Sequence, residues 1–106
     1  MIFFAADTSN YKTSLALYDT EGEETAYCGR VLPVREGECG LRQNDTLFHH
    51  TVNAPPLAEE LLSGKSIQLT AAAASGRPRE ERGSYMPCFL AGVAQARTVA
   101  SAFSIP

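Results

Sequence analysis

The sequence has no tryptophan and only three cysteines, an odd number that forms no Cys-x-x-Cys pair. Free thiols in a reducing compartment fit this content better than a disulfide framework, so we expect a cytoplasmic protein. No apolar run approaches the ~20 residues that a membrane-spanning helix needs. The first apolar stretch, residues 2–6, meets Asp7 too soon for a secretory signal. We therefore expect no membrane partner.

Charge is also scarce. The chain has 9 Lys and Arg against 12 Asp and Glu, which gives a net charge of −3. This mildly acidic balance gives no electrostatic reason to expect broad, nonspecific nucleic-acid binding. With 106 residues, 44% of them hydrophobic and 20% charged, the chain has the size and composition of one globular domain.

Several catalytic motifs are missing. The sequence contains no His-Glu-x-x-His, no Gly-x-Ser-x-Gly and no Gly-x-x-x-x-Gly-Lys-Ser/Thr, so zinc peptidases, nucleophile-elbow hydrolases and P-loop nucleotidases find no support. A zinc site built from Cys28, Cys39 and the pair His49-His50 would match no known ligand spacing. Adjacent helical residues point about 100° apart, so a packing or capping role is favoured for the two histidines.

Three apolar segments near the start predict strands. Residues 2–6 are nearly continuous apolar residues, as in a strand buried on both faces. In residues 13–18, Leu15 and Leu17 alternate with Ser14 and Ala16. A third strand is expected over residues 25–32. Because only short polar turns separate the three, they predict an antiparallel meander.

A helix is expected after the loop of residues 33–42. Asn44 or Asp45 can cap its start, and Ser63-Gly64 ends it. Pro55-Pro56 should kink or split it, because proline lacks the N–H and clashes with the preceding turn. The expected apolar face consists of Leu47, Val52, Leu57, Leu61 and Leu62.

The last two elements complete an α/β order. A strand over residues 67–74 follows a helix and should run parallel to an earlier strand through a right-handed crossover. A final helix is expected over residues 86–103, with Pro87 in its first turn and Gly92 allowing close packing. Its predicted inner face carries Phe89, Val93, Ala96 and Ala100. The order β-β-β-α-β-α, with sheet order 3-2-1-4, is that of a ribonuclease-H-like lobe of actin-like ATPases.

The segment DTSNYKTS, residues 7–14, is the main candidate for chemistry. Asp7 ends a buried strand, and its carboxylate can hold Mg²⁺, usually through water. Thr8, Ser9 and Asn10 form a turn whose amides and hydroxyls can face phosphate oxygens, and Lys12 adds a positive charge. The alternative is an ordinary hairpin turn in which Asp7 and Ser9 satisfy backbone groups.

Other candidates are weaker. The charged loop of residues 34–45 can serve a site, and the arginines of residues 77–82 can hold an anionic ligand, but a solvated loop is the favoured interpretation of both. Cys88 falls in the first turn of the last helix, where a thiol pKa can be lowered. A simply buried cysteine is the commoner case.

Residues 3–19, FFAADTSNYKTSLALYD, resemble the opening of the glycoprotease-like (Gcp/TsaD) family, a strand followed by Asp/Glu-Thr-Ser and a second strand ending in Asp. The resemblance continues through SGKSIQLTAAAAS, residues 63–75, and the last helix before Ile105-Pro106. It covers nearly all of the chain but about the first third of a usual member. It departs at Tyr11 and Lys12, where the family carries acidic residues, and at the arginine loop of residues 76–83, where it has Gly-Pro-Gly.

The resemblance implies an actin-like ATPase fold of two lobes, with residues 1–106 as a single N-terminal lobe of a longer protein. It implies ATP and Mg²⁺ between the lobes, neither of them tightly bound to this chain alone, and Asp7, Thr8 and Ser9 match the family's first phosphate-loop positions. The implied reaction is threonylcarbamoyl transfer to adenosine 37 of tRNA. The older family name, O-sialoglycoprotein endopeptidase, implies a metallopeptidase, which we interpret as an inherited label.

The expected partner is the second lobe or a related subunit, with tRNA contacted only indirectly. Because the family's HxxxH metal motif and second lobe are not among these residues, we expect this lobe alone to be inactive. A homodimer through an exposed apolar face is also expected. Two alternatives stay open: a non-catalytic dimerising partner of such an enzyme, and a lobe of an actin-fold small-molecule kinase.

Overall fold

The computed structural model describes residues 1–34, 37, 40–80 and 86–106. The elements are β1 (Ile2–Asp7), β2 (Lys12–Asp19), β3 (Glu24–Val31), α1 (Gln43–Leu62), β4 (Leu69–Ala74) and α2 (Phe89–Phe103). The strands form one sheet in the order β3-β2-β1-β4. Strand β1 runs antiparallel to β2 and parallel to β4, and β2 runs antiparallel to β3. The predicted α/β class, element order and sheet order are confirmed.

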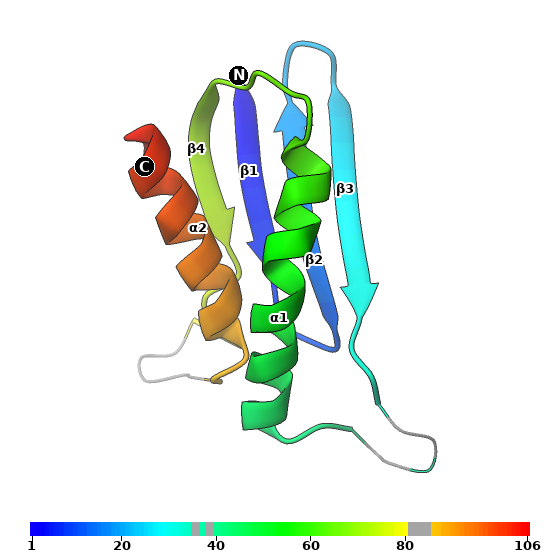
Figure 1. The fold of residues 1–106 in the computed structure, drawn as a ribbon. Helices are drawn as coiled ribbons and strands as arrows, with labels where there is room; N and C mark the ends of the chain where they lie inside the picture. Colours follow the sequence, from blue (N-terminus) through cyan, green and yellow to red (C-terminus); the bar gives the residue numbers. More distant parts are fainter. Residues whose placement is uncertain (35–36, 38–39, 81–85) are drawn as a thin grey trace.

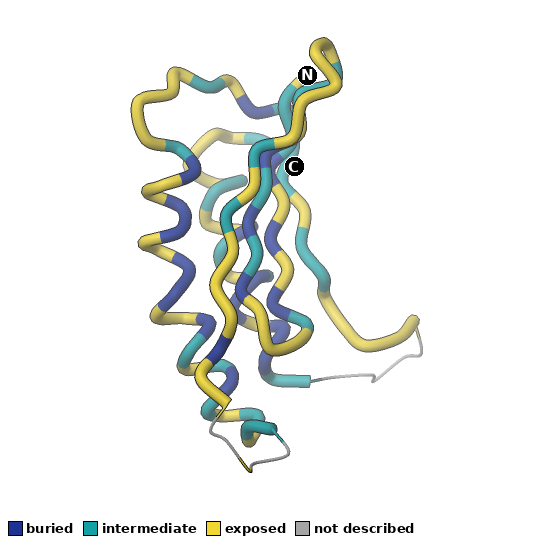
Figure 2. The backbone as a smooth tube through the Cα atoms, turned by 90° about the vertical axis from the view of Figure 1, so that its right-hand side faces the viewer, coloured by how far each residue is buried: buried dark blue, intermediate teal, exposed yellow. Residues whose placement is uncertain are grey.

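Both helices cover the same face of the sheet (Figure 1). In the view turned by 90°, the buried residues of α1 lie on its side toward the strands (Figure 2). Strand β2 shows the resulting alternation, because Thr13, Leu15 and Leu17 are buried while Ser14 and Ala16 are only partly covered. We call the sheet face opposite the helices the open face.

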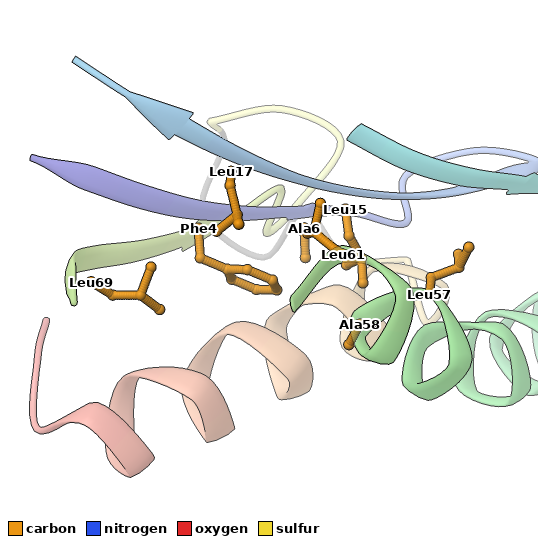
Figure 3. Close-up of a cluster of buried hydrophobic side chains, with 8 residues drawn as sticks. All are labelled: Phe4, Ala6, Leu15, Leu17, Leu57, Ala58, Leu61 and Leu69. Atoms are coloured by element: carbon orange, nitrogen blue, oxygen red, sulfur yellow. The ribbon is translucent and has the colours of Figure 1, made fainter. Parts of the chain in front are cut away.

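The core lies between the sheet and the helices. Side chains from β1, β2 and β4 meet side chains from α1 in one layer (Figure 3). Phe4 is completely buried at its centre, and burying such a side chain contributes roughly 1.5–3 kcal/mol. The cluster consists of Phe4, Ala6, Leu15, Leu17, Leu57, Ala58, Leu61 and Leu69.

Helix α1 corrects three sequence expectations. It begins at Gln43, and Arg42 at its N-cap makes no side-chain capping bond, so Asn44 and Asp45 are not caps. It also runs unsplit through Pro55-Pro56. Both prolines are exposed, so the carbonyls that lose a donor four residues earlier can bond to water instead.

The third correction concerns the face that α1 buries. Val52 is 51% exposed, whereas Leu57 and Leu61 are buried as expected. The N-terminal half of the helix instead buries the polar side chains of Thr46, His50 and Asn53. A polar network near the end of β1, described below, takes the place of the missing apolar contacts.

Helix α2 begins at Phe89, and Pro87 lies in the turn before it, where its carbonyl accepts a bond from Leu90 N. Phe89 and Ala96 are buried as predicted. The close packing expected at Gly92 is confirmed, since a Cβ there would stand 2.9 Å from Thr8 Oγ1. Within the described residues, neither helix is long and apolar enough to cross a membrane.

Candidate functional site

Asp7 occupies the carboxyl end of β1, beside the carboxyl end of β4. Because these strands are parallel, both chains leave the sheet at the same edge, and Ser75 N donates to Ala6 O at 3.2 Å. The Asp7 side chain is exposed, and its Oδ1 accepts from Ser9 N at 2.9 Å. Partial burial raises the pKa of Asp7, but hydrogen bonds from Ser9 and Ser75 outweigh it and hold the pKa below 3.8. Asp7 is therefore an ionised carboxylate at neutral pH.

Thr8 faces the other way and anchors the loop to α2. Its side chain is 1% exposed. Its hydroxyl donates to Cys88 O at 2.8 Å and accepts from Gly92 N at 2.9 Å. Both bonds are buried and reach the first turns of α2. The Thr8 hydroxyl is thus engaged within the protein. The prediction that Thr8 binds phosphate therefore concerns the backbone amide of this residue.

His50 anchors the other side of the same loop. Its Nε2 lies 2.7 Å from Asn10 O, and because a carbonyl oxygen only accepts, Nε2 carries the proton. Its Nδ1 then accepts from Thr13 Oγ1 at 2.8 Å, and Thr13 Oγ1 accepts from Asn53 Nδ2 at 3.2 Å. Burial lowers the pKa of His50, although the bond to Asn10 raises it. A neutral histidine satisfies every partner in this chain of bonds.

The two anchors fix the loop from Asp7 to Lys12 on the sheet. Asn10 is exposed, with its carbonyl held by His50, and Ser9 is half-buried. Lys12 is the first residue of β2 and is exposed. The loop therefore brings together Asp7, Ser9, Asn10 and Lys12 at one end of the sheet, as the sequence predicted, and turns only Thr8 inward.

An open pocket of about 350 Å³ adjoins this loop on the open face. Its floor is small and apolar, and Asp7, Ser14 and Ser75 contribute the polar groups. Sequence reasoning did not single out Ser14 or Ser75 as site residues. Ser75 followed the predicted fourth strand, and the parallel pairing with β1 was the signal that could have placed it beside Asp7. The remaining lining residues are Ala5, Ala6, Leu15, Ala16, Ala73 and Ala74.

The chemistry of these groups fits a magnesium–phosphate complex better than a metal held by the protein alone. The described part of the chain holds no group of three or more His, Cys, Asp or Glu suited to a metal. Mg²⁺ commonly uses one or two carboxylates and completes its shell with water and phosphate oxygens. The single ionised carboxylate of Asp7 meets that requirement.

The other cysteine and histidine candidates are packing residues. Cys88 is 1% exposed at the N-cap of α2, and burial raises its pKa, so the low-pKa alternative is wrong. Burial also raises the pKa of Cys28. Both ring nitrogens of His50 are hydrogen-bonded, to Asn10 and Thr13, so His50 is not available to the zinc site considered from the sequence. Cys39 of that site lies outside the described residues.

The two candidate loops are described only in part. Arg35, Glu36 and Glu38 of the first loop lie outside the described residues, as does the segment 81–85 with Arg82. Arg42 is described, and its Nε donates to Asp45 Oδ2 at 3.2 Å on the exposed start of α1. Such an exposed pair contributes little to stability.

The anchoring residues His50, Asn53 and Gly92 were missed as parts of the site. Their positions could have indicated a role in the site. His50 and Asn53 are polar residues on the buried face of α1, and Gly92 interrupts a helix otherwise rich in alanine. Polar residues that tertiary structure buries need partners. The sequence alone did not show that those partners were Asn10, Thr13 and Thr8.

The sequence matches no family model and no curated protein. Among solved structures, the chain is similar to YeaZ from Pseudomonas aeruginosa, with a TM-score of 0.68 and 19% identity over 99% of this chain and 41% of that one. A second similar structure is that of an uncharacterized protein with similarity to peptidase YEAZ from Pseudomonas aeruginosa. Its TM-score is 0.67 and its sequence identity 18%, over 99% of this chain and 40% of that one.

The chain thus spans about two fifths of the length of these two structures. At such low identity the likeness establishes the fold. The predicted α/β lobe with sheet order β3-β2-β1-β4 is therefore confirmed as a fold that this chain shares with YeaZ.

Proposed function

We propose that this chain is the N-terminal lobe of a glycoprotease-like protein related to tRNA threonylcarbamoyladenosine biosynthesis, and that it carries half of an ATP and magnesium site. The proposal rests on three supports: the sequence resemblance, the shared fold with YeaZ and the geometry of the Asp7 loop. A second lobe, on the same chain or on a related subunit, supplies the rest of the nucleotide site. Transfer to tRNA belongs to the assembled protein, and tRNA touches this lobe only indirectly.

The observation that carries the proposal is the exposed, ionised carboxylate of Asp7 at the shared carboxyl edge of β1 and β4. Ligands of open α/β sheets bind outside the carboxyl ends of their strands. The loop behind the carboxylate is immobilised by His50 on one side and by Thr8 on the other. A rigid carboxylate needs no rearrangement to meet a cation, so it can orient a magnesium-bound phosphate at low entropic cost.

In the assembled site, ATP with Mg²⁺ would supply the activated phosphoryl chemistry. Asp7, whose side chain is fixed by the Ser9 amide, would hold the magnesium, usually through water, while the amide of Asn10 and the ammonium of Lys12 would face phosphate oxygens. Closing a second lobe over this edge excludes water and strengthens these charge interactions. One lobe without base and ribose contacts should bind at about millimolar affinity, on the order of −4 kcal/mol. This is why we expect no tightly bound cofactor and no activity from the lobe alone.

A direct binding measurement tests the proposal. Titration of magnesium ATP into the chain, followed by NMR chemical shifts, should give a dissociation constant of about 1 mM. Asp7→Asn keeps the side-chain carbonyl that accepts from Ser9 N but removes the charge, and it should weaken binding at least about tenfold. Wild-type affinity in Asp7→Asn would remove the nucleotide site from the proposal.

The chain offers a matched control at the other end of the sheet. Asp19 Oδ1 accepts from Glu21 N at 3.0 Å, the same local turn that Asp7 makes with Ser9 N. Asp19 is the last residue of β2 and pairs with Ile2, at the end of the sheet away from the proposed site. Asp19→Asn should therefore leave magnesium ATP binding unchanged, and equal losses in both variants would mean that the measurement reports only net charge.

A non-catalytic dimerising partner is a second candidate, supported by an apolar stripe on α1. Phe48 is 62% and Val52 is 51% exposed, and Pro55 and Pro56 are exposed one turn further on. Residues at this spacing share one helix face. Two copies of the chain can therefore pack these α1 faces against each other. Sedimentation should show a dimer that Val52→Glu dissociates. A strict monomer at micromolar concentration would contradict this reading.

A further inference from the structure

A cluster of side chains on the open face extends the edge that carries Asp7. Tyr27 of β3 is paired with Ala16 of β2, but its hydroxyl lies 3.2 Å from Ser14 Oγ, two residues nearer the start of β2. The ring therefore leans along the sheet toward the Asp7 end. Lys12 Nζ lies 5.1 Å from the centre of the same ring, within the range of a cation–π contact.

Gly29 makes this placement of Tyr27 possible. It is paired with Ser14 across β2 and β3. A Cβ built on Gly29 would collide with the Tyr27 hydroxyl and would stand 2.8 Å from Lys12 Cε. Any larger residue would displace both side chains from the sheet surface. Gly29 has no positive φ, so its small size explains its presence here.

The cluster joins the Asp7 site directly. Asp7 and Ser14 are register partners across β1 and β2, and both line the pocket on the open face. Among the described residues, the salt bridge found joins Arg42 to Asp45 and does not involve Lys12. The Lys12 ammonium instead contacts the face of the Tyr27 ring. An exposed ammonium without a carboxylate partner is well suited to an anion.

We propose that Lys12, Tyr27 and Ser14 form a subsite for a phosphoryl oxyanion, and that Gly29 gives Tyr27 its position there. The inference rests on the proposed function and deepens it, because the oxyanion belongs to the phosphate whose cation Asp7 holds. Lys12 supplies the charge, the Tyr27 phenol donates the directed hydrogen bond to the oxyanion, and Ser14 orients that phenol by donating to its oxygen. Hydrogen bonds from Lys12 and Ser14 lower the pKa of Tyr27, which makes its phenol a stronger donor.

The test uses magnesium pyrophosphate as the probe and calorimetry on the full chain. Tyr27→Phe keeps the ring under Lys12 but removes the hydroxyl, and it should weaken binding about threefold to tenfold. Tyr18→Phe is the matched control, since Tyr18 lies on the same face of β2 and is 42% exposed. Lys12→Met should weaken binding at least tenfold, and Lys12→Arg should restore part of it.

Gly29→Ala separates positioning from folding. Alanine suits a strand better than glycine, so the free energy of unfolding should stay the same or rise while pyrophosphate binding falls at least as far as in Tyr27→Phe. Gly22→Ala is the control, because a Cβ there meets only the Glu24 side chain at ordinary distance. A purely structural role for Gly29 would move stability and binding together.

The outcomes distinguish the subsite from the site itself. If Asp7→Asn abolishes binding while Tyr27→Phe and Gly29→Ala bind like wild type, the subsite is wrong and the proposed function stands. If Asp7→Asn also binds like wild type, the proposed function fails. Wild-type protein that does not bind magnesium pyrophosphate at all would overturn the subsite as well.

Discussion

Replacing Thr13 with valine tests the network that holds the candidate site. Thr13 is completely buried, and its hydroxyl donates to His50 Nδ1 and accepts from Asn53 Nδ2. Valine has nearly the same shape, so the change removes hydrogen bonds without opening a cavity. It leaves two polar groups without partners, each at a cost of roughly 1–3 kcal/mol.

The expected loss is therefore about 2 to 6 kcal/mol, a large part of the roughly 5–15 kcal/mol that stabilises a small domain. Urea unfolding followed by far-ultraviolet circular dichroism measures it, since the chain has no tryptophan to serve as a fluorescent probe. The melting temperature should fall by at least about 8 °C. The matched control is Thr25→Val on an exposed position of β3, which should change stability by no more than about 0.5 kcal/mol. Equal effects of the two substitutions would refute the proposed bonding of His50.

Three further predictions follow from the same contacts. Because burial holds the pKa of His50 below its ordinary value of 6.5, the unfolded chain binds the proton more readily; His50 stabilises the fold fully above about pH 6.5, and this contribution is lost as the pH falls toward the folded-state pKa. Gly92→Ala should not give the roughly 1 kcal/mol that alanine usually adds to a helix, because its Cβ meets Thr8 Oγ1 at 2.9 Å. Iodoacetamide should label Cys28 faster than the buried Cys88, as peptide mass spectrometry can measure.

Each of these has a result that counts against it. Urea unfolding at several pH values between 7.5 and 5 would show a flat profile if His50 were not buried neutral. A stabilised Gly92→Ala variant would mean that Thr8 does not pack against α2. Labelling of Cys88 as fast as Cys28 would mean that the N-terminus of α2 opens readily in the folded protein.

The topology followed from the sequence because each local signal agreed with the next. The alternation of Leu15 and Leu17, the short turns and the helical crossover before β4 left one plausible sheet order, and the structure has it. The Asp7 loop was also visible, since turn-forming residues directly follow a buried strand. These features depend on residues close together in the chain.

The parts that sequence reasoning missed depend on residues far apart. His50 lies 40 positions from Asn10, and Gly92 lies 84 positions from Thr8. The sequence analysis assigned Val52 to the core because it took only apolar side chains at helical spacing as the buried face of the helix. The fold buries His50 and Asn53 at those levels of α1 instead, since a bonded polar group is stable there.

The most direct test of the account locates the cation. Manganese can replace magnesium in a complex with ATP, and its unpaired electrons broaden the NMR signals of nearby amides. The account predicts that the amides of Ser9, Asn10 and Ser75 broaden first in the wild-type chain, that the amide of Glu21 stays sharp, and that Asp7→Asn removes the effect. Broadening spread evenly over the exposed carboxylates, or centred near Asp19, would contradict it.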